Sequence, residues 1–249
     1  MTRNASTDVP SLSTTPPGGA IEITGVAGSG KSTTARSLCE HDRFRRATFI
    51  HARRPSHLLE ILLSVPRLGG ILLRGIARPP RITWPEVKLL AYVERGARIL
   101  EREHQGPGEV LVFDQGPLYA LVRLEAEARS FTRHPSFEAW AQRQIGRWAE
   151  RLDVVAWLDA PDDVLVGRIN SREQAHRHKG DDVAEGRRFL RRYRDAFQDL
   201  LRELDGVGGP AIVRIDTSVS GPDEAVRTIL GAVERPGVGT QRRPGMRAR

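Results

Sequence analysis

The sequence predicts an α/β fold in which a parallel sheet is covered by helices on both faces. Short, continuous apolar runs alternate with longer segments of helical character, as in sheets whose strands are buried on both sides. Three of these runs are followed directly by Asp114, Asp159 and Asp216. Ligands of such folds bind where the carboxyl ends of the strands meet, so we expect a site there. The runs expected to form strands are 20–24, 47–51, 109–113, 153–158 and 211–215.

The first expected strand leads into a glycine-rich loop, and a helix is expected over 32–40. The loop reads GVAGSGKST and fits the phosphate-binding pattern GxxxxGK[ST]. Glycine allows backbone conformations that let the loop turn its N–H groups around phosphate oxygens, at the positive end of the following helix. The residues expected to bind a nucleoside triphosphate are Gly25, Gly28, Ser29, Gly30, Lys31, Ser32 and Thr33.

Two residues of this loop and one later carboxylate are candidates for chemistry. Lys31 is expected to reach the β- and γ-phosphates, and the Ser32 hydroxyl is expected to ligate Mg²⁺. Asp114, which ends the expected strand 109–113, is the second candidate magnesium ligand. It also suits acceptance of a proton from an attacking hydroxyl. The alternative is an aspartate that only caps the turn over 115–117.

The segment 55–108 is too long for one simple crossover and is expected to form a helical region on the acceptor side. Its apolar runs are interrupted by Pro66, Gly69 and Gly70, which makes them too short and broken to span a bilayer. We predict two short buried helices there, followed by a longer amphipathic helix over 84–103. Two alternatives are a mobile apolar wall over the acceptor site and a surface that touches lipid.

The segment 168–194 is strongly basic, with nine Lys and Arg against four acids. A flexible basic segment after the fourth strand suits a lid that delivers arginines to a transferring phosphoryl group and excludes water. Arg168, Arg172 and Arg177 are the expected catalytic contributors, whereas the arginines of 187–194 are expected mostly to face solvent. The alternative is an ordinary solvated basic face or a nucleic-acid patch.

The ends of the chain differ in composition from the expected domain over 20–233. Residues 1–19 are rich in Ser, Thr, Pro and Gly. The tail 234–249 is basic, with five arginines and no acid over 235–249, and both ends are expected to be disordered. The formal net charge is +8, and this tail accounts for much of it. The single cysteine, Cys39, excludes an internal disulfide and suits a cytoplasmic protein. No specific nucleic-acid partner is expected, and the oligomeric state, a homodimer included, stays open.

With the loop, Asp114 and the basic lid segment in place, the chain resembles the nucleoside and nucleotide kinase group of P-loop proteins, and thymidylate-kinase-like members in particular. The resemblance covers about 20–233. It includes the loop 25–33, Asp114 at the place of that family's Asp-Arg motif, the stretch 157–161 before the lid, and the lid arginines. It implies use of ATP and Mg²⁺, transfer of the γ-phosphate to an acceptor, and a three-layer α/β/α sandwich with five parallel strands in the order 2-3-1-4-5 and a helical lid.

Three positions depart from thymidylate kinases. Ala27 stands where they carry an Asp within the loop, Gln115 replaces the Arg of the Asp-Arg motif, and 53–55 reads Arg-Arg-Pro where they have Arg-Glu-Pro. These departures favour an acceptor other than thymidylate: a nucleoside, another nucleotide, a sugar or a specialised metabolite. The alternative function is a P-loop ATPase or nucleotide-gated interaction protein that engages a protein or membrane partner.

Overall fold

The protein has a five-stranded, all-parallel sheet with the strand order β2-β3-β1-β4-β5. The computed structural model describes residues 19–47, 55–77, 81–103, 108–127, 131–171 and 183–235. Both the α/β fold and the strand order implied by the family resemblance are therefore confirmed. The strands are β1 (Gly19–Gly25), β2 (Phe44–Arg46), β3 (Val110–Asp114), β4 (Val154–Asp159) and β5 (Ala211–Asp216).

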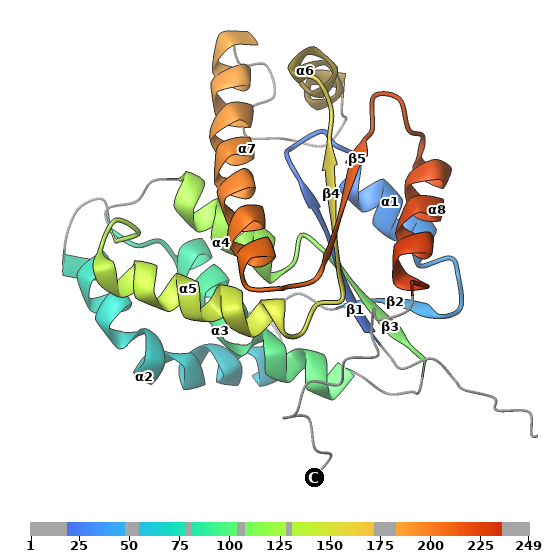
Figure 1. Cartoon of the computed structure of the whole chain (residues 1–249). Helices are drawn as coiled ribbons and strands as arrows, with labels where there is room; N and C mark the ends of the chain where they lie inside the picture. The colour runs from blue at the N-terminus through green and yellow to red at the C-terminus, as the bar shows by residue number, and fades with distance from the viewer. Residues whose placement is uncertain are drawn as a thin grey trace, which may run out of the picture.

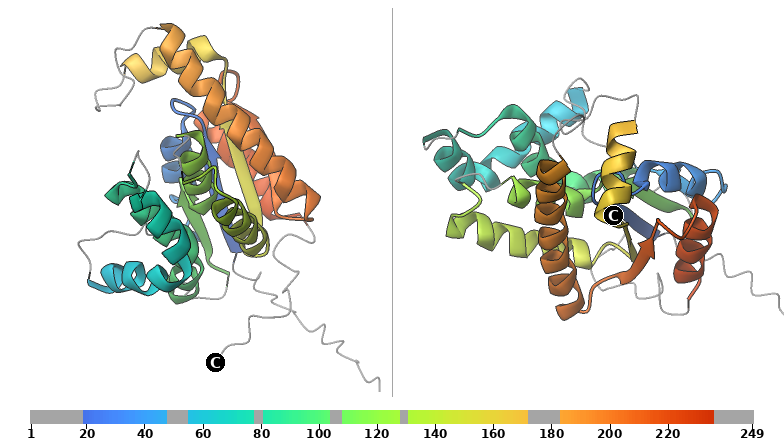
Figure 2. Two further views of the ribbon diagram at one scale, coloured as in Figure 1. Left: turned by 90° about the vertical axis from the view of Figure 1, so that its left-hand side faces the viewer. Right: turned by 90° about the horizontal axis from the view of Figure 1, so that it is seen from above.

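Helices cover both faces of this sheet, as Figure 1 shows. Helices α1 and α8 pack together on one face, while α3, α4, α5 and α7 form the layer on the other. In Figures 1 and 2, α2 lies at the outer edge of that second layer, where it packs against α3 and α5. The helices are α1 (Lys31–Leu38), α2 (Pro55–Ala77), α3 (Trp84–Glu103), α4 (Pro117–Ala126), α5 (Pro135–Ala149), α6 (Asp162–Ser171), α7 (Val183–Gly206) and α8 (Pro222–Val233).

The strands alternate their side chains between two apolar cores. Ile21 and Ile23 of β1 pack in the core beneath α1 and α8, whereas Ala20 belongs to the core beneath α3, α4, α5 and α7. All seven residues of β1 are buried. A central parallel strand covered on both faces must be apolar on both faces, which is why these strands read as continuous apolar runs in the sequence.

The second strand lies earlier in the chain than the sequence predicts. The prediction of 47–51 is wrong in position, because β2 spans only Phe44–Arg46 and pairs with β3 at the sheet edge. Residues 48–54 lie outside the described part of the chain. Arg45 and Arg46 are exposed on this edge, and charged side chains on a short edge strand remove the apolar signal that marks the central strands.

The first half of the acceptor-side region forms one helix, so the prediction of two short buried helices is wrong. Helix α2 runs for 23 residues through Pro66, Gly69 and Gly70 without a break. Proline removes one helical hydrogen bond, but Pro66 is exposed, so water can satisfy the freed carbonyl group on this side of the helix. The helix is also only half buried, because one face packs on α3 while the other carries exposed apolar side chains.

The second half of that region confirms the prediction of a longer helix. Helix α3 begins at Trp84, directly after Thr83. Glu86 Oε2 accepts hydrogen bonds from the backbone N of Thr83 at 2.6 Å and from its hydroxyl at 2.7 Å, which is the carboxylate half of a capping box. Within the described residues, no helix combines the length and the apolar character that crossing a bilayer requires.

Candidate active site

The loop between β1 and α1 depends on its glycines for its shape. Gly25, Gly28 and Gly30 have φ angles of 149°, 84° and 83°, in a region that side chains rarely tolerate. A Cβ atom at Gly25 would lie 2.0 Å from the carbonyl oxygen of Leu158, and one at Gly28 would lie 2.9 Å from that of Leu165. The loop is therefore pressed against β4 and α6, and its conformation is the one the glycine-rich motif predicts.

The side chains of the loop converge on one backbone carbonyl. Val26 O accepts hydrogen bonds from Lys31 Nζ at 2.6 Å and from the Ser29 hydroxyl at 2.9 Å. Lys31 is 6% exposed, so its ammonium group is held inside the curve of the loop. Ser32 and Thr33 are exposed at the start of α1, where the N-terminus of the helix adds positive potential. The loop is a concave surface that favours anions.

Asp114 lies beside this loop, at the end of β3. In the β1–β3 ladder it pairs with Ile23, two residues before the loop begins. Its carboxylate is 5% exposed, and Oδ2 accepts a hydrogen bond from the Arg46 guanidinium at 2.5 Å. Oδ1 is buried and has no hydrogen-bond partner among the described residues. A buried carboxylate oxygen with free lone pairs suits a hard cation such as Mg²⁺, which binds oxygen ligands.

The turn that follows Asp114 has an unusual backbone and an unusual neighbour. Gln115 has a φ of 61° and is the one non-glycine residue with positive φ in the described part of the chain. Gly116 lies against the carboxylate of Glu22, where a Cβ atom would come within 2.7 Å of Oε2. That carboxylate also accepts backbone N–H bonds from Leu118 at 3.0 Å and Tyr119 at 2.7 Å, at the N-terminus of α4.

Glu22 is fully buried in the middle of β1. Burial raises its pKa to about 8 from an ordinary 4.5, while the backbone N–H groups of Leu118, Tyr119 and Gly116 oppose the shift. Glu22 is not among the residues that the sequence motifs indicate. Its one signal in the sequence is a carboxylate inside an otherwise apolar strand, which requires a specific partner that sequence spacing does not reveal.

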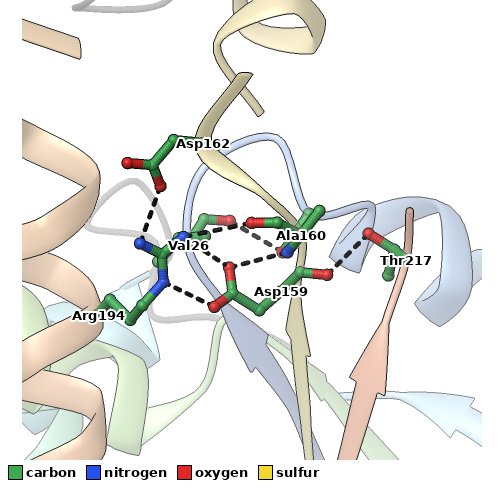
Figure 3. Close-up of polar contacts among 7 residues, drawn as sticks. Val26, Asp159, Ala160, Asp162, Arg194 and Thr217 are labelled. Carbon is green, nitrogen blue, oxygen red and sulfur yellow. Dashed lines mark hydrogen bonds and ion pairs between the residues drawn. The ribbon is translucent and has the colours of Figure 1, made fainter. Parts of the chain in front are cut away.

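Arg194 of α7 forms ion pairs at the carboxyl end of β4, as Figure 3 shows. It donates to Asp159 through Nε at 2.7 Å and through a terminal nitrogen at 3.1 Å, and its other terminal nitrogen donates to Asp162 at 2.9 Å. The hydrogen bond to Asp159 raises the pKa of Arg194, so the guanidinium stays charged. The expectation that the arginines of 187–194 mostly face solvent is wrong for this residue, which is 20% exposed.

Arg168 of α6 links the phosphate loop to the segment after β5. Its guanidinium donates to the Thr217 hydroxyl at 2.9 Å, to the Thr217 carbonyl at 2.8 Å, and to the Gly28 carbonyl at 3.5 Å. Of the three expected lid arginines, the structure thus brings Arg168 to the loop. Arg172 and Arg177 lie outside the described residues.

An open groove of about 610 Å³ lies at the carboxyl ends of β4 and β5. The Arg194 ion pairs form part of its wall, beside the indole of Trp157. Both arginine and aspartate side chains line it, so the groove carries both signs of charge. Its charged lining residues are Asp159, Asp162, Arg194, Arg214 and Asp216.

Comparison with known proteins finds similar folds but no similar sequence family. No family model and no curated protein matches the chain. Among solved structures, it is similar to thymidylate kinase from Candida albicans, with 14% identity and a TM-score of 0.55 over 88% of this chain and 92% of that one. It is also similar to deoxyadenosine kinase from M. mycoides with bound dATP, with 12% identity and a TM-score of 0.51 over 87% of this chain and all of that one. The chain has the fold of the P-loop nucleoside and nucleotide kinases.

Proposed function

We propose that this protein is an ATP- and Mg²⁺-dependent kinase that transfers the γ-phosphate to a small-molecule acceptor. The observation that carries the proposal is the juxtaposition of a complete phosphate loop with Asp114 on the neighbouring strand, whose buried Oδ1 has no partner in the described part of the chain. A loop of this kind binds phosphates, and a carboxylate beside it supplies the second protein ligand that P-loop enzymes use for magnesium. The fold shared with nucleoside and nucleotide kinases supports the same proposal.

The loop residues bind and orient the triphosphate. The amides of Gly28 and Gly30 surround the phosphate oxygens, and Ser29 N joins them by releasing its bond to Val26 O at 3.3 Å. Lys31 releases its bond to the same carbonyl to reach the β- and γ-phosphates. The Ser32 hydroxyl, together with Asp114, holds Mg²⁺. When bound, the metal would neutralise charge on the β- and γ-phosphate oxygens.

Asp114 is also the candidate general base. The acceptor hydroxyl oxygen forms the new bond to the γ-phosphorus as the bond from that phosphorus to the bridging oxygen of ADP breaks. The hydroxyl proton passes to the carboxylate, whose Oδ2 is oriented by Arg46. One carboxylate can serve as both metal ligand and base because Oδ1, unpartnered within the described ranges, is open to the metal and Oδ2 keeps a second lone pair beside the one that accepts from Arg46.

Arginines from the lid complete the proposal. Arg168 is already attached to the loop through Gly28 O, and α6 carries it over the carboxyl edge of the sheet. Arg172 and Arg177 follow α6 in the sequence, and we assign them to the transferring phosphoryl group. Arg194 is assigned a different role, because its bonds to Asp159 and Asp162 fix α7 against the end of β4.

The class of phosphate acceptor is inferred from two charged residues that the phosphate loop and the turn after β3 lack. Ala27 and Gln115 cannot make the ionic contacts that an aspartate and an arginine make in thymidylate kinases, which disfavours thymidylate. The structural neighbours, a thymidylate kinase and a deoxyadenosine kinase, favour a nucleoside or another nucleotide over a sugar or a specialised metabolite. The half-buried thiol of Cys39 suits a reducing compartment, and we place the protein in the cytoplasm.

The direct test is an acceptor screen with γ-labelled ATP and Mg²⁺, in which label is followed onto nucleosides, nucleotides and sugars. The proposal predicts label on one acceptor class, loss of that transfer in Asp114→Asn, and its retention in Asp205→Asn. Asp205 is an exposed residue near the end of α7 and serves as the matched control. Release of free phosphate alone, at a rate that no acceptor changes, would reject the kinase.

That rejection would favour the second candidate, a P-loop ATPase that engages a partner. The specific observation in its favour is the row of exposed apolar side chains on α2, which no described element covers. Hydrolysis stimulated by lipid vesicles or by a protein, but by no metabolite, would support it.

A further inference from the structure

Helix α2 exposes most of the large apolar side chains that the described residues leave in solvent. The outer stripe, defined as its six exposed members, is 43–70% exposed, and beyond α2 the described residues expose only Trp84, Val207 and Val219 to this degree. Each member lies three, four, eleven or fourteen residues from at least one other, spacings that are close to whole turns of a helix, so they share one side of it. The members of the outer stripe are Leu59, Leu62, Leu63, Val65, Leu73 and Ile76.

The opposite side of α2 already has its partner. Ile61, Leu68 and Ile71 are buried against the body of the protein, together with Ser64. The helix is therefore apolar on two sides, and its inner side alone accounts for its attachment to α3. In Figures 1 and 2 the helix lies at the periphery of the molecule. A contiguous exposed apolar patch of this kind marks an interaction surface rather than a requirement of the fold.

The charge around the outer stripe is positive. Over the span of the stripe, 59–76, the helix carries Arg67 and Arg74 against one acid, Glu60, and both arginines are exposed. Just before and just after the helix, the sequence adds arginines at 53, 54, 78 and 81. Basic residues beside a long apolar helix face are the features of helices that lie in the interface of an anionic membrane.

We propose that the outer stripe of α2 docks the protein onto an anionic lipid surface, with the helix lying in the plane of the interface. The stripe spans 17 residue steps, or about 26 Å of helix, which is long enough for a stable in-plane contact. Its apolar side chains enter the boundary of the acyl chains, while Arg67 and Arg74 extend along it to reach the phosphate groups of the lipids. This inference goes beyond the kinase and does not depend on its chemistry.

A second copy of the chain fits this surface less well. In a two-fold pairing of the stripe with itself, Arg67 and Arg74 of each copy would lie along the edge of the apolar contact, because they follow Leu63 by four and eleven residues. The pairing would therefore bring arginines of both copies to the rim of the contact. Glu94, the partner of Arg67 within the chain, is buried and lies 3.6 Å from Nε, and the Arg67 side chain stays 56% exposed. Anionic headgroups supply the opposite charge that a second copy does not.

The test is flotation of the full chain with vesicles of phosphatidylcholine and phosphatidylglycerol in equal parts, against vesicles of phosphatidylcholine alone. The wild type is expected to bind the anionic vesicles more tightly and to be released by salt. The combined variant Leu62→Gln, Leu73→Gln, Ile76→Gln is expected to bind about 100-fold more weakly, because each side chain is more than half exposed and loses its transfer into the interface.

The matched control replaces two apolar residues that are at least 58% exposed, as the three α2 residues are, but lie elsewhere. Val207→Gln with Val219→Gln, at 58% and 80% exposure, is expected to bind like the wild type. Equal binding by the wild type and the α2 variant would place the contact elsewhere, for instance on the basic tail, and overturn the proposal. Absence of binding, or self-association that the α2 variant abolishes, would also overturn it and in the second case assign the surface to another copy.

Tryptophan fluorescence gives a readout that needs no α2 variant. Trp84 is half exposed, whereas Trp140, Trp148 and Trp157, the other three in the chain, are at most 5% exposed. Trp84 lies near the end of α2, because the backbone N of Ile82 donates to Gly75 O at 2.7 Å. Anionic vesicles are expected to shield Trp84 from quenching by acrylamide. In a separate measurement, the variant Arg74→Gln is expected to bind the anionic vesicles about 5-fold more weakly, because it loses one basic side chain. Unchanged quenching with vesicles present would contradict the proposed orientation.

Discussion

The buried carboxyl of Glu22 makes the stability of this protein depend on pH in an unusual direction. Burial raises the pKa of Glu22 to about 8. The folded protein therefore holds this proton more tightly than the unfolded chain, whose carboxyl titrates near the ordinary 4.5. The stabilisation is complete below the unfolded pKa and is lost as the pH rises through the folded pKa. The free energy of unfolding falls across this window and levels off above it.

The size of the effect follows from the two pKa values. Between about pH 6 and about pH 9, linkage gives a loss of about 2.5 kcal/mol of unfolding free energy from this one group. The assay is urea denaturation of the wild type and of Glu22→Gln at both pH values. The amide cannot titrate, so the variant is expected to lack this part of the pH dependence, whatever its stability at a single pH.

The N-terminus of α4 opposes the effect of burial on the pKa of Glu22. Three backbone N–H groups point at the Glu22 carboxylate, and they favour its charged form. If the wild type and Glu22→Gln lose stability in parallel between the two pH values, these donors outweigh burial and the reasoning is refuted. Because all other titrating groups are common to both proteins, the comparison isolates Glu22.

Two further substitutions test the packing around the site. Gly116→Ala places a methyl group 2.7 Å from the Glu22 carboxylate and is expected to cost about 2 kcal/mol in urea denaturation. Gly146→Ala, inside α5 with open space around it, is the control and is expected to stabilise by about 0.5 kcal/mol; equal effects would contradict the predicted clash. Arg194→Ala removes both bonds to Asp159 and is expected to cost about 2 kcal/mol. A loss below about 0.5 kcal/mol would show that this pair does not hold α7.

The central strands β1, β3 and β4 were predictable from sequence because burial on both faces leaves a local signal. Each appears as a short apolar run that falls within one or two residues of the observed strand. β5 is the other edge strand and is mostly not buried, but the apolar run at 211–215 marks its position as well. The edge strand β2 was misplaced, because one face of it is solvated and two of its three residues are arginines. The apolar run that follows at 47–51 carried the stronger signal but lies largely outside the described residues.

The phosphate loop and Asp114 were predictable because their positions follow from the order of elements along the chain. The sequence could not indicate contacts between residues far apart. Glu22 meets the N-terminus of α4 nearly a hundred residues later, and Arg194 meets Asp159 across the α6–α7 region. Pairing of this kind depends on the packed arrangement of helices, which no local pattern encodes. The continuity of α2 is the opposite case. Pro66, Gly69 and Gly70 disfavour a helix locally, but the packing of Ile61, Leu68 and Ile71 in the core holds the helix through them.

The most direct test of the central claim is γ-phosphate transfer by Lys31→Ala, measured in a single turnover with the acceptor that the screen identifies. Lys31 is the one charged side chain held inside the loop, and its removal is expected to slow transfer at least about 100-fold. Thermal unfolding should stay close to that of the wild type, and Lys88→Ala, on α3, should transfer normally. Transfer by a folded Lys31→Ala at the rate of the wild type would contradict the assignment of the loop as the site of phosphoryl transfer.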